Sequence, residues 1–581
     1  MRQKQTAGNW GRRGCAFVAV FCSLAAVAAT AQQSPATQQT SKGAQSNPAP
    51  GVQSSPAPAS PAPATGSAAP ATHITPEQAK QLFASVDEIM KFASDDSGLP
   101  IESPVKRQLT SRAAVEQYLE TKFDSDQDSK RLERDEIVLK KFGLLDRDFE
   151  LKPFLLALLR EQIEAYYDTK TKTVNLLDWV QPDEQKPVLA HELTHALQDQ
   201  HSDLEKWDNQ TPDDVSTTAA GDQVNLAKDE MDTARDAVAE GQATAVMMDY
   251  VLKPLGKSLI KDPEVIDIVR KHMTASSDSP VMARAPLLLS ESMLFPYRDG
   301  LSFEQDIWMD EGQTAAFAGT LDRPPTSSWE IINPLDYERK LIPPVPLLPD
   351  IHPLVDKLYR PYDIGQVGQL DVKILSQIFG GDETSRDLTS AWDGGLYWAG
   401  QLRSAATPAE RDSTKSLALF YLSISRNPAS AQEFTRMYAD NLGRKYLSVK
   451  PDEAAQSSAS AEEGDVEQDF ITEEGPVLIT TRGNMVFVAE SFPFDMARKL
   501  TSLILDAQGG GAMQMTQLAP PAWLFAPQAH PTAVPASQLG EPLSAGFVRF
   551  FSNCGVMKAV VDAKMDAATR LRPAVSENQT R

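Results

Sequence analysis

Cysteine and positive charge are both scarce in this chain. It has 581 residues but only 3 Cys, which is too few for a disulfide scaffold. Its 56 Lys and Arg are outnumbered by 79 Asp and Glu, giving a formal net charge of −23. A general nucleic-acid-binding protein needs a basic face to meet phosphates, so this balance argues against one. It also disfavours docking on an anionic membrane surface.

Long hydrophobic runs are missing as well, except near the N-terminus. There the apolar stretch 15–28 follows several basic residues and precedes Ala29-Thr30-Ala31, which fits a small-residue cleavage site. The stretch is shorter than the roughly 20 residues of a spanning helix, although an uncleaved anchor is the alternative. We predict that residues 1–31 are a signal peptide. The mature protein is then exported, periplasmic or extracellular, without stable membrane insertion.

Composition divides the rest of the chain into four parts. Residues 32–74 are rich in Pro, Ala, Ser and Gln, which predicts a disordered linker. Residues 75–353 and 354–506 are expected to form two folded domains. In the second, helix-like and strand-like stretches alternate, and an acidic loop is expected at 452–474. Residues 507–581 are expected to be a Gly/Pro-rich tail, partly disordered. The predicted fold class is α+β.

Four elements matter for the first domain. Apolar residues recur at helical spacing from Thr75 towards Leu159, which predicts helices there. Residues 165–177 have the pattern of a β-hairpin. Residues 182–203 are predicted to form one helix and residues 222–252 another, longer one.

The clearest chemical signal is the run His191-Glu192-Leu193-Thr194-His195. On a helix, positions i and i+4 share a face, so both imidazoles can bind one metal ion. A carboxylate at Glu192 can take a proton from a water molecule that the metal activates. This spacing is the H-E-x-x-H arrangement, and it predicts a Zn²⁺ site with Glu192 as general base.

A third metal ligand is needed, and two residues compete for the role. His201 has the spacing of the third His in H-E-x-x-H-x-x-G-x-x-H, but Gln198 replaces the Gly that breaks the helix. On a continuing helix His201 lies about 9 Å beyond His195 along the axis. Glu240 is favoured instead, because it lies on an otherwise small or apolar helical stripe, where a carboxylate needs a cation.

The surroundings of Glu240 leave further readings open. Its cation can be a basic residue such as Arg235 rather than a metal ion. Asp236, one turn earlier, can orient a His ligand or be a solvated helix charge. Gly241 and Ala243 are expected to let this helix approach the His191 helix closely.

Other polar and aromatic residues are weaker candidates. Tyr166, Tyr167 and Asn175 of the hairpin can contact an extended substrate, although core and turn roles are favoured. A donor for a developing oxyanion is also needed. The candidates for it are Tyr167, His272 and Tyr297, and the sequence does not choose among them.

The segments around these residues resemble a group of exported bacterial proteins with a gluzincin-like site. The similarity rests on His191–His201, with H-E-x-x-H, and on Ala239-Glu240-Gly241-Gln242-Ala243-Thr244, with E-G-x-A-T. Further similar stretches are 295–300, 323–327, 371–397 and 431–434. The resemblance spans Thr75–Leu505. It implies a mainly helical, zincin-like catalytic domain with a small β-hairpin or sheet, followed by an α+β accessory domain.

The resemblance also implies zinc ligands His191, His195 and Glu240, with Glu192 as general base. The chain departs from the group at Asn333, where the group has a His before Pro. The predicted function is an exported zinc metallopeptidase acting on peptide or protein substrates. The alternatives are a catalytically weak or inactive zinc-binding cell-envelope scaffold, and a zinc hydrolase acting on a non-peptide amide.

Overall fold

The computed structural model describes residues 73–509, apart from 124–125, 163–164, 209, 211, 213–214, 264, 267–279 and 453–465. The predicted signal peptide, linker residues 32–72 and tail residues 510–581 therefore lie outside the described residues, as does His272. Within the described ranges, none of the helices combines the length and the apolar character that crossing a membrane requires.

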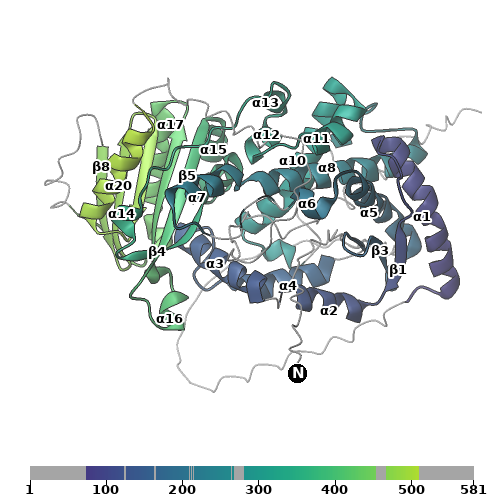
Figure 1. The fold of residues 1–581 in the computed structure, drawn as a ribbon, viewed down its shortest axis with the longest axis horizontal. Helices are drawn as coiled ribbons and strands as arrows, with labels where there is room; N and C mark the ends of the chain where they lie inside the picture. The colour runs from purple at the N-terminus through teal and green to yellow at the C-terminus, as the bar shows by residue number, and fades with distance from the viewer. Residues whose placement is uncertain are drawn as a thin grey trace, which may run out of the picture.

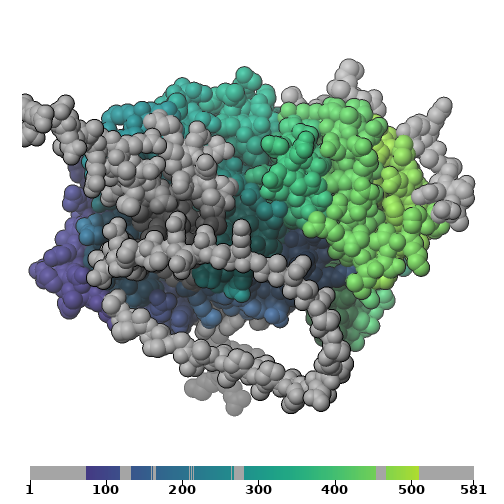
Figure 2. Space-filling model, turned by 180° about the vertical axis from the view of Figure 1, so that it is seen from behind, coloured from purple at the N-terminus to yellow at the C-terminus, as the bar shows by residue number. Residues whose placement is uncertain are grey.

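The described chain is α+β, and its two kinds of structure lie side by side (Figure 1). Residues up to about 355 are mainly helical, and the residues after them build around a large sheet. Seen from behind, these segments also occupy opposite ends of the molecule (Figure 2). The helices of the first segment are α1 (Pro76–Ser97), α2 (Arg112–Phe123), α3 (Asp126–Phe142), α4 (Leu151–Gln162), α5 (Pro182–Ser202), α6 (Leu204–Asp208), α7 (Ala219–Lys228), α8 (Met231–Leu252), α10 (Leu287–Glu311), α11 (Thr320–Asp322), α12 (Ser328–Ile332), α13 (Pro334–Glu338) and α14 (His352–Val355).

A three-stranded sheet lies beside α5 in the order β1-β3-β2. The expected hairpin is present as β2 (Ala165–Asp168) and β3 (Thr173–Leu177), which pair antiparallel. The expectation of helices alone from Thr75 to Leu159 was wrong at β1 (Lys106–Thr110). That strand pairs parallel with β3, residue 106 opposite 173. Its partner lies more than sixty residues away, so local spacing did not reveal it.

The long helix predicted at 222–252 is two helices, α7 and α8. They are separated at Asp229 and Glu230, whose carboxylates bind groups outside the helix. Asp229 accepts a hydrogen bond from the Gln366 backbone nitrogen (2.7 Å), and Glu230 accepts one from the Ser328 hydroxyl (2.5 Å). These contacts attach the start of α8 to the rest of the molecule.

The second segment contains a seven-stranded antiparallel sheet in the order β4-β5-β6-β10-β9-β8-β7. Its strands are β4 (Tyr359–Gln366), β5 (Trp392–Leu402), β6 (Leu417–Ser425), β7 (Val449–Pro451), β8 (Val466–Thr472), β9 (Gly475–Arg482) and β10 (Met485–Glu490). The helices of this segment are α15 (Gln369–Ser390), α16 (Pro408–Arg411), α17 (Pro428–Asp440), α18 (Leu442–Lys445) and α20 (Phe494–Ala507). The loop expected at 452–474 was therefore wrong for residues 466–472, which pair with β9.

Both faces of this sheet are covered, which explains the continuous apolar run of β6. Leu419 and Tyr421 face one side, where α15 and α17 pack. Phe420 and Leu422 face the other, where α14 and α20 pack. Because side chains alternate along a strand, a strand buried on both faces needs apolar residues at every position.

Candidate metal centre

The helix α5 carries the H-E-x-x-H residues, and its sequence explains where it begins and where it ends. Pro182 occupies its first turn, where a missing N–H costs nothing, and Asp183 and Glu184 complement the positive end of the helix dipole. The helix continues through His201 to Ser202 and ends at Asp203, which has left-handed backbone (φ 49°). The α5 residues around the motif are buried, and α1, α8 and β2 pack against the helix.

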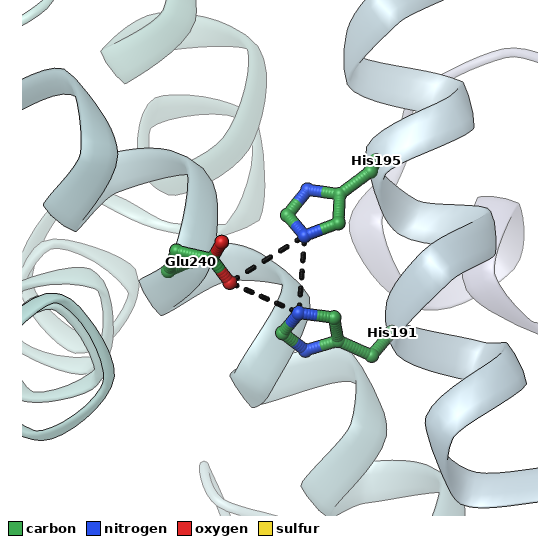
Figure 3. A group of neighbouring side chains, drawn as sticks. All are labelled: His191, His195 and Glu240. Carbon is green, nitrogen blue, oxygen red and sulfur yellow. Dashed lines mark hydrogen bonds and ion pairs between the residues drawn. The ribbon is translucent and has the colours of Figure 1, made fainter. Parts of the chain in front are cut away.

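Three side chains converge between α5 and α8 (Figure 3). His191 Nε2 lies 3.0 Å from His195 Nε2 and 3.0 Å from Glu240 Oε2. His195 Nε2 lies 3.5 Å from the same Glu240 oxygen. Both imidazoles are fully buried and Glu240 is 5% exposed. The structure therefore brings together, as a group that could hold a metal ion, the three residues predicted to be ligands.

The three side chains of this group shift one another's pKa values. Burial raises the pKa of Glu240, but His195 and His191 lower it more, to about 2. Burial lowers the pKa of His195, but Glu240 and Glu192 more than offset this and raise it to about 8. Burial also lowers the pKa of His191. Without a metal ion, this buried carboxylate relies on a proton shared with imidazole as its counter-charge.

The donor set fits a zinc ion. Bonds of about 2.0–2.2 Å at tetrahedral angles separate ligand atoms by about 3.3–3.6 Å. The three observed distances, 3.0, 3.0 and 3.5 Å, are close to this range. Two imidazoles and one carboxylate leave a fourth position for water or substrate, which is the arrangement of catalytic rather than structural zinc sites. The three side chains therefore form a group that could hold a metal ion.

Glu192 lies next to this group on α5 and is fully buried. Its Oε2 accepts a hydrogen bond from the Tyr167 backbone nitrogen (2.7 Å), so strand β2 fixes the carboxyl group. Its Oε1 is buried without a hydrogen-bond partner among the described residues. Without a metal ion, burial and the Glu240 carboxylate raise the pKa of Glu192 to about 8 against the opposing effect of His195. A cation bound by the neighbouring group would lower this pKa and favour the ionised carboxylate. One oxygen is held and the other is available for proton transfer.

Gln198, which from sequence is only a residue that fails to break the helix, orients His195. Its Oε1 lies 2.8 Å from His195 Nδ1. Three residues after a His on a helix, a Gln can reach back to the ring, so the spacing alone held this signal. The sequence had pointed to Asp236 for such a role.

Two of the three oxyanion candidates can be placed. Tyr167 uses its hydroxyl to bind Asp199 Oδ2 at 2.7 Å. The Tyr297 ring is nearly parallel to that of His191, with centroids 6.2 Å apart. Its hydroxyl is buried without a well-formed hydrogen bond to the described residues. Burial and the nearby carboxylates of Glu240 and Glu192 raise the pKa of Tyr297 well above the ordinary value, so it remains protonated.

Other sequence candidates lie elsewhere. His201 faces Asp322, with Nε2 3.1 Å from Oδ1. Asn175 accepts from Thr110 and donates to the Thr173 carbonyl, and Tyr166 is buried in β2. The Asn333 amide binds the Trp329 carbonyl and Gln369, both at 2.7 Å.

Gly241 of α8 allows close approach to a different helix from the one expected. Gly241 was expected to bring α8 close to α5. It instead meets the backbone of α10 at Gly300. Small residues on this side of α8 therefore set the distance to the helix that carries Tyr297, while Glu240 faces α5.

No protein-family model, curated protein or solved structure matches this chain.

Proposed function

We propose that this protein is an exported zinc-dependent metallopeptidase with a gluzincin-like site and a zincin-like catalytic domain. The observation that carries the proposal is the convergence of His191, His195 and Glu240 in one buried group beside the carboxyl of Glu192. The resemblance of the H-E-x-x-H and E-G-x-A-T segments supports it. Polypeptide is the proposed substrate.

In this proposal His191, His195 and Glu240 hold the zinc ion. Bound zinc supplies Lewis acidity, which polarises a carbonyl and makes a hydroxide nucleophile available near neutral pH. Glu192 accepts the proton of the attacking water at Oε1, and its Oε2 stays fixed by Tyr167 N–H. Glu192 then passes that proton to the leaving amine nitrogen as the peptide bond breaks.

Tyr297 is the proposed donor for the negative charge that develops on the carbonyl oxygen. It is buried, protonated and next to the ligand group, whereas the Tyr167 hydroxyl is held by Asp199. A hydroxyl that is already buried beside the reacting group needs little reorganisation to stabilise the transition state.

The test combines metal content with cleavage. Full-length protein loaded with one equivalent of zinc is expected to cleave denatured casein. Glu192→Gln keeps the metal and loses cleavage, because the variant cannot accept a proton. Equal inertness of wild type and variant across varied protein substrates, with zinc bound, would refute the peptidase proposal.

The ligand set has its own matched pair of variants. Glu240→Ala is expected to lose zinc, while His201→Ala keeps it, because His201 lies against Asp322. Zinc content after dialysis, measured by atomic absorption, decides between them. Loss of zinc in His201→Ala alone would overturn the assignment.

A second candidate is a zinc-binding scaffold without peptidase activity. The observation in its favour is Asn333, which stands where the resembling group has a His and whose amide binds the Trp329 carbonyl and Gln369 instead. It predicts that zinc removal lowers the melting temperature while casein stays intact at every zinc concentration.

A further inference from the structure

The hydrogen bonds of the ligand group continue well beyond Gln198. Its Nε2 donates to Gln242 Oε1 at 2.9 Å and to the Ala239 carbonyl at 2.9 Å. These contacts join α5 to α8 through buried amides, since Gln198 and Gln242 are both fully buried.

Gln242 is bound in turn by a π-helical turn, η3 (Ala315–Gly319), and the residue after it. Gln242 Nε2 lies 3.0 Å from the Ala316 and Phe317 carbonyls and 2.8 Å from Thr320 Oγ1. The Thr320 hydroxyl donates to the Ala316 carbonyl at 2.6 Å, so it accepts from Gln242. A π-helical turn is rare, and such turns often occur at functional sites.

The orientation of both amides in this chain of hydrogen bonds is fixed, because a backbone carbonyl oxygen can only accept a hydrogen bond. The η3 carbonyls require the amide nitrogen of Gln242 on their side, so its oxygen faces Gln198. The amide nitrogen of Gln198 must then face Gln242 and Ala239, so its oxygen faces His195. In the neutral ring that binds a metal ion, His195 therefore carries its proton on Nδ1, and the Nε2 lone pair faces His191 and Glu240.

We infer that Gln198, Gln242 and η3 form a positioning relay that fixes the tautomer and ring orientation of His195 for metal binding. A hydrogen bond to the distal nitrogen of a His ligand orients the ring and raises its basicity, and losing such a partner typically costs about 10–100-fold in metal affinity or activity. The hydrogen bonds of Gln242 in the relay go to Gln198, to η3 and to Thr320. Its effect therefore reaches His195 through Gln198. The inference rests on the metal-binding part of the proposed function and is independent of peptide hydrolysis.

A double-mutant cycle on zinc affinity tests the relay. Gln198→Met and Gln242→Met keep the length of the side chain and remove the amide. Each is expected to weaken zinc binding, measured by competition with a chromophoric chelator, by about 10–100-fold. The double variant should bind about as weakly as Gln198→Met alone, because the second change acts through the first residue. Effects that multiply in the double variant would contradict the relay.

Gln305→Met is the matched control. Gln305 is also a buried Gln whose Nε2 binds a backbone carbonyl, that of Leu259 at 3.0 Å, away from the relay. It should leave zinc affinity unchanged. An equal loss in this control, or wild-type affinity in Gln242→Met, would overturn the inference. The Co²⁺ absorption bands report ligand geometry directly and should change in Gln242→Met but not in Gln305→Met.

Further measurements distinguish failure of the relay from misfolding of a variant and from failure of the proposed function. If Gln198→Met does not fold by circular dichroism, Thr320→Val removes one acceptor at the far end of the relay. It should weaken zinc binding in the same direction, and unchanged affinity would count against the relay. If wild type binds no zinc, both proposals fail. If it binds zinc and cleaves casein while Gln242→Met equals wild type, only the relay is wrong.

Discussion

Gly241 of α8 and Gly300 of α10 meet backbone to backbone. A Cβ atom on Gly241 would lie 2.4 Å from the Gly300 carbonyl carbon, and one on Gly300 would lie 2.1 Å from the Ala237 carbonyl oxygen. Real Cβ atoms essentially never come this close to backbone atoms, so neither position accepts a side chain without a shift of one helix. The contact is one residue from Glu240 and three from Tyr297.

Gly241→Ala is therefore expected to separate α8 from α10. Overpacking of this kind typically costs about 1–3 kcal/mol of stability. Zinc affinity should also fall by about tenfold or more, because a site tolerates ligand shifts of only about 0.5 Å. Thermal melts and chelator competition measure the two effects. Gly443→Ala, with open space around it, is the control, and equal behaviour of the two variants would contradict this account.

Tyr297→Phe removes only a hydroxyl group beside the metal ligands. As the oxyanion donor, its loss should lower kcat by about 10²–10³-fold, with KM and zinc content nearly unchanged. Tyr167→Phe is the matched variant. Its hydroxyl binds Asp199, so it should lower stability by about 1 kcal/mol and leave kcat close to wild type. The reverse pattern would assign the role to Tyr167.

Glu230 makes stability depend on pH at the start of α8. Burial and the carboxylate of Asp371 raise its pKa from 4.5 to about 8. Between these two values the folded state holds a proton that the unfolded state has lost. The contribution of Glu230 to the free energy of unfolding is therefore lost as pH rises from about 4.5 to about 8.

Glu230→Gln cannot titrate and keeps an acceptor for Ser328. We expect the variant to match wild type near pH 5 and to be more stable near pH 9, by a few kcal/mol. Melting temperatures of both proteins at the two pH values measure this. A difference that is the same at pH 5 and pH 9 would show that Glu230 is not the titrating group.

Glu490 is a fully buried carboxylate in the large sheet. It accepts hydrogen bonds from Tyr438 (2.7 Å), Tyr446 (2.5 Å) and Lys445. Glu490→Gln leaves the buried Lys445 charge without its directly paired carboxylate, which should cost about 3–5 kcal/mol in chemical denaturation. Removing both charges, in Glu490→Gln with Lys445→Met, should recover part of this. Exposed Glu383→Gln should change nothing.

The grouping of His191, His195 and Glu240 was predictable because local helix geometry and burial signal it. The spacing of His191 and His195 places both rings on one face of any helix, and a carboxylate at Glu240 among small and apolar residues signals a buried charge. The same logic correctly kept α5 unbroken through His201.

Other features depended on parts of the chain that are distant in sequence. Gln198 and Gln242 form a relay only because η3, more than seventy residues after Gln242, presents two carbonyls to it. Strand β1 forms because β3 offers it a parallel edge. The helical periodicity of the sequence runs through Asp229 and Glu230 without a break. The helices α7 and α8 nevertheless separate there, because the carboxylates of these two residues bind Gln366 and Ser328.

The attachment at the start of α8 limits how the chain can be divided. Shortening it near residue 353 would remove Gln366 and Gly368, against which Asp229 and Glu230 are packed. The start of the helix that carries Glu240, about 15 Å further along its axis, would then lose the Gln366 backbone donor and the packing that hold it. A minimal fragment that keeps all three metal ligands should therefore also retain the β4–α15 turn.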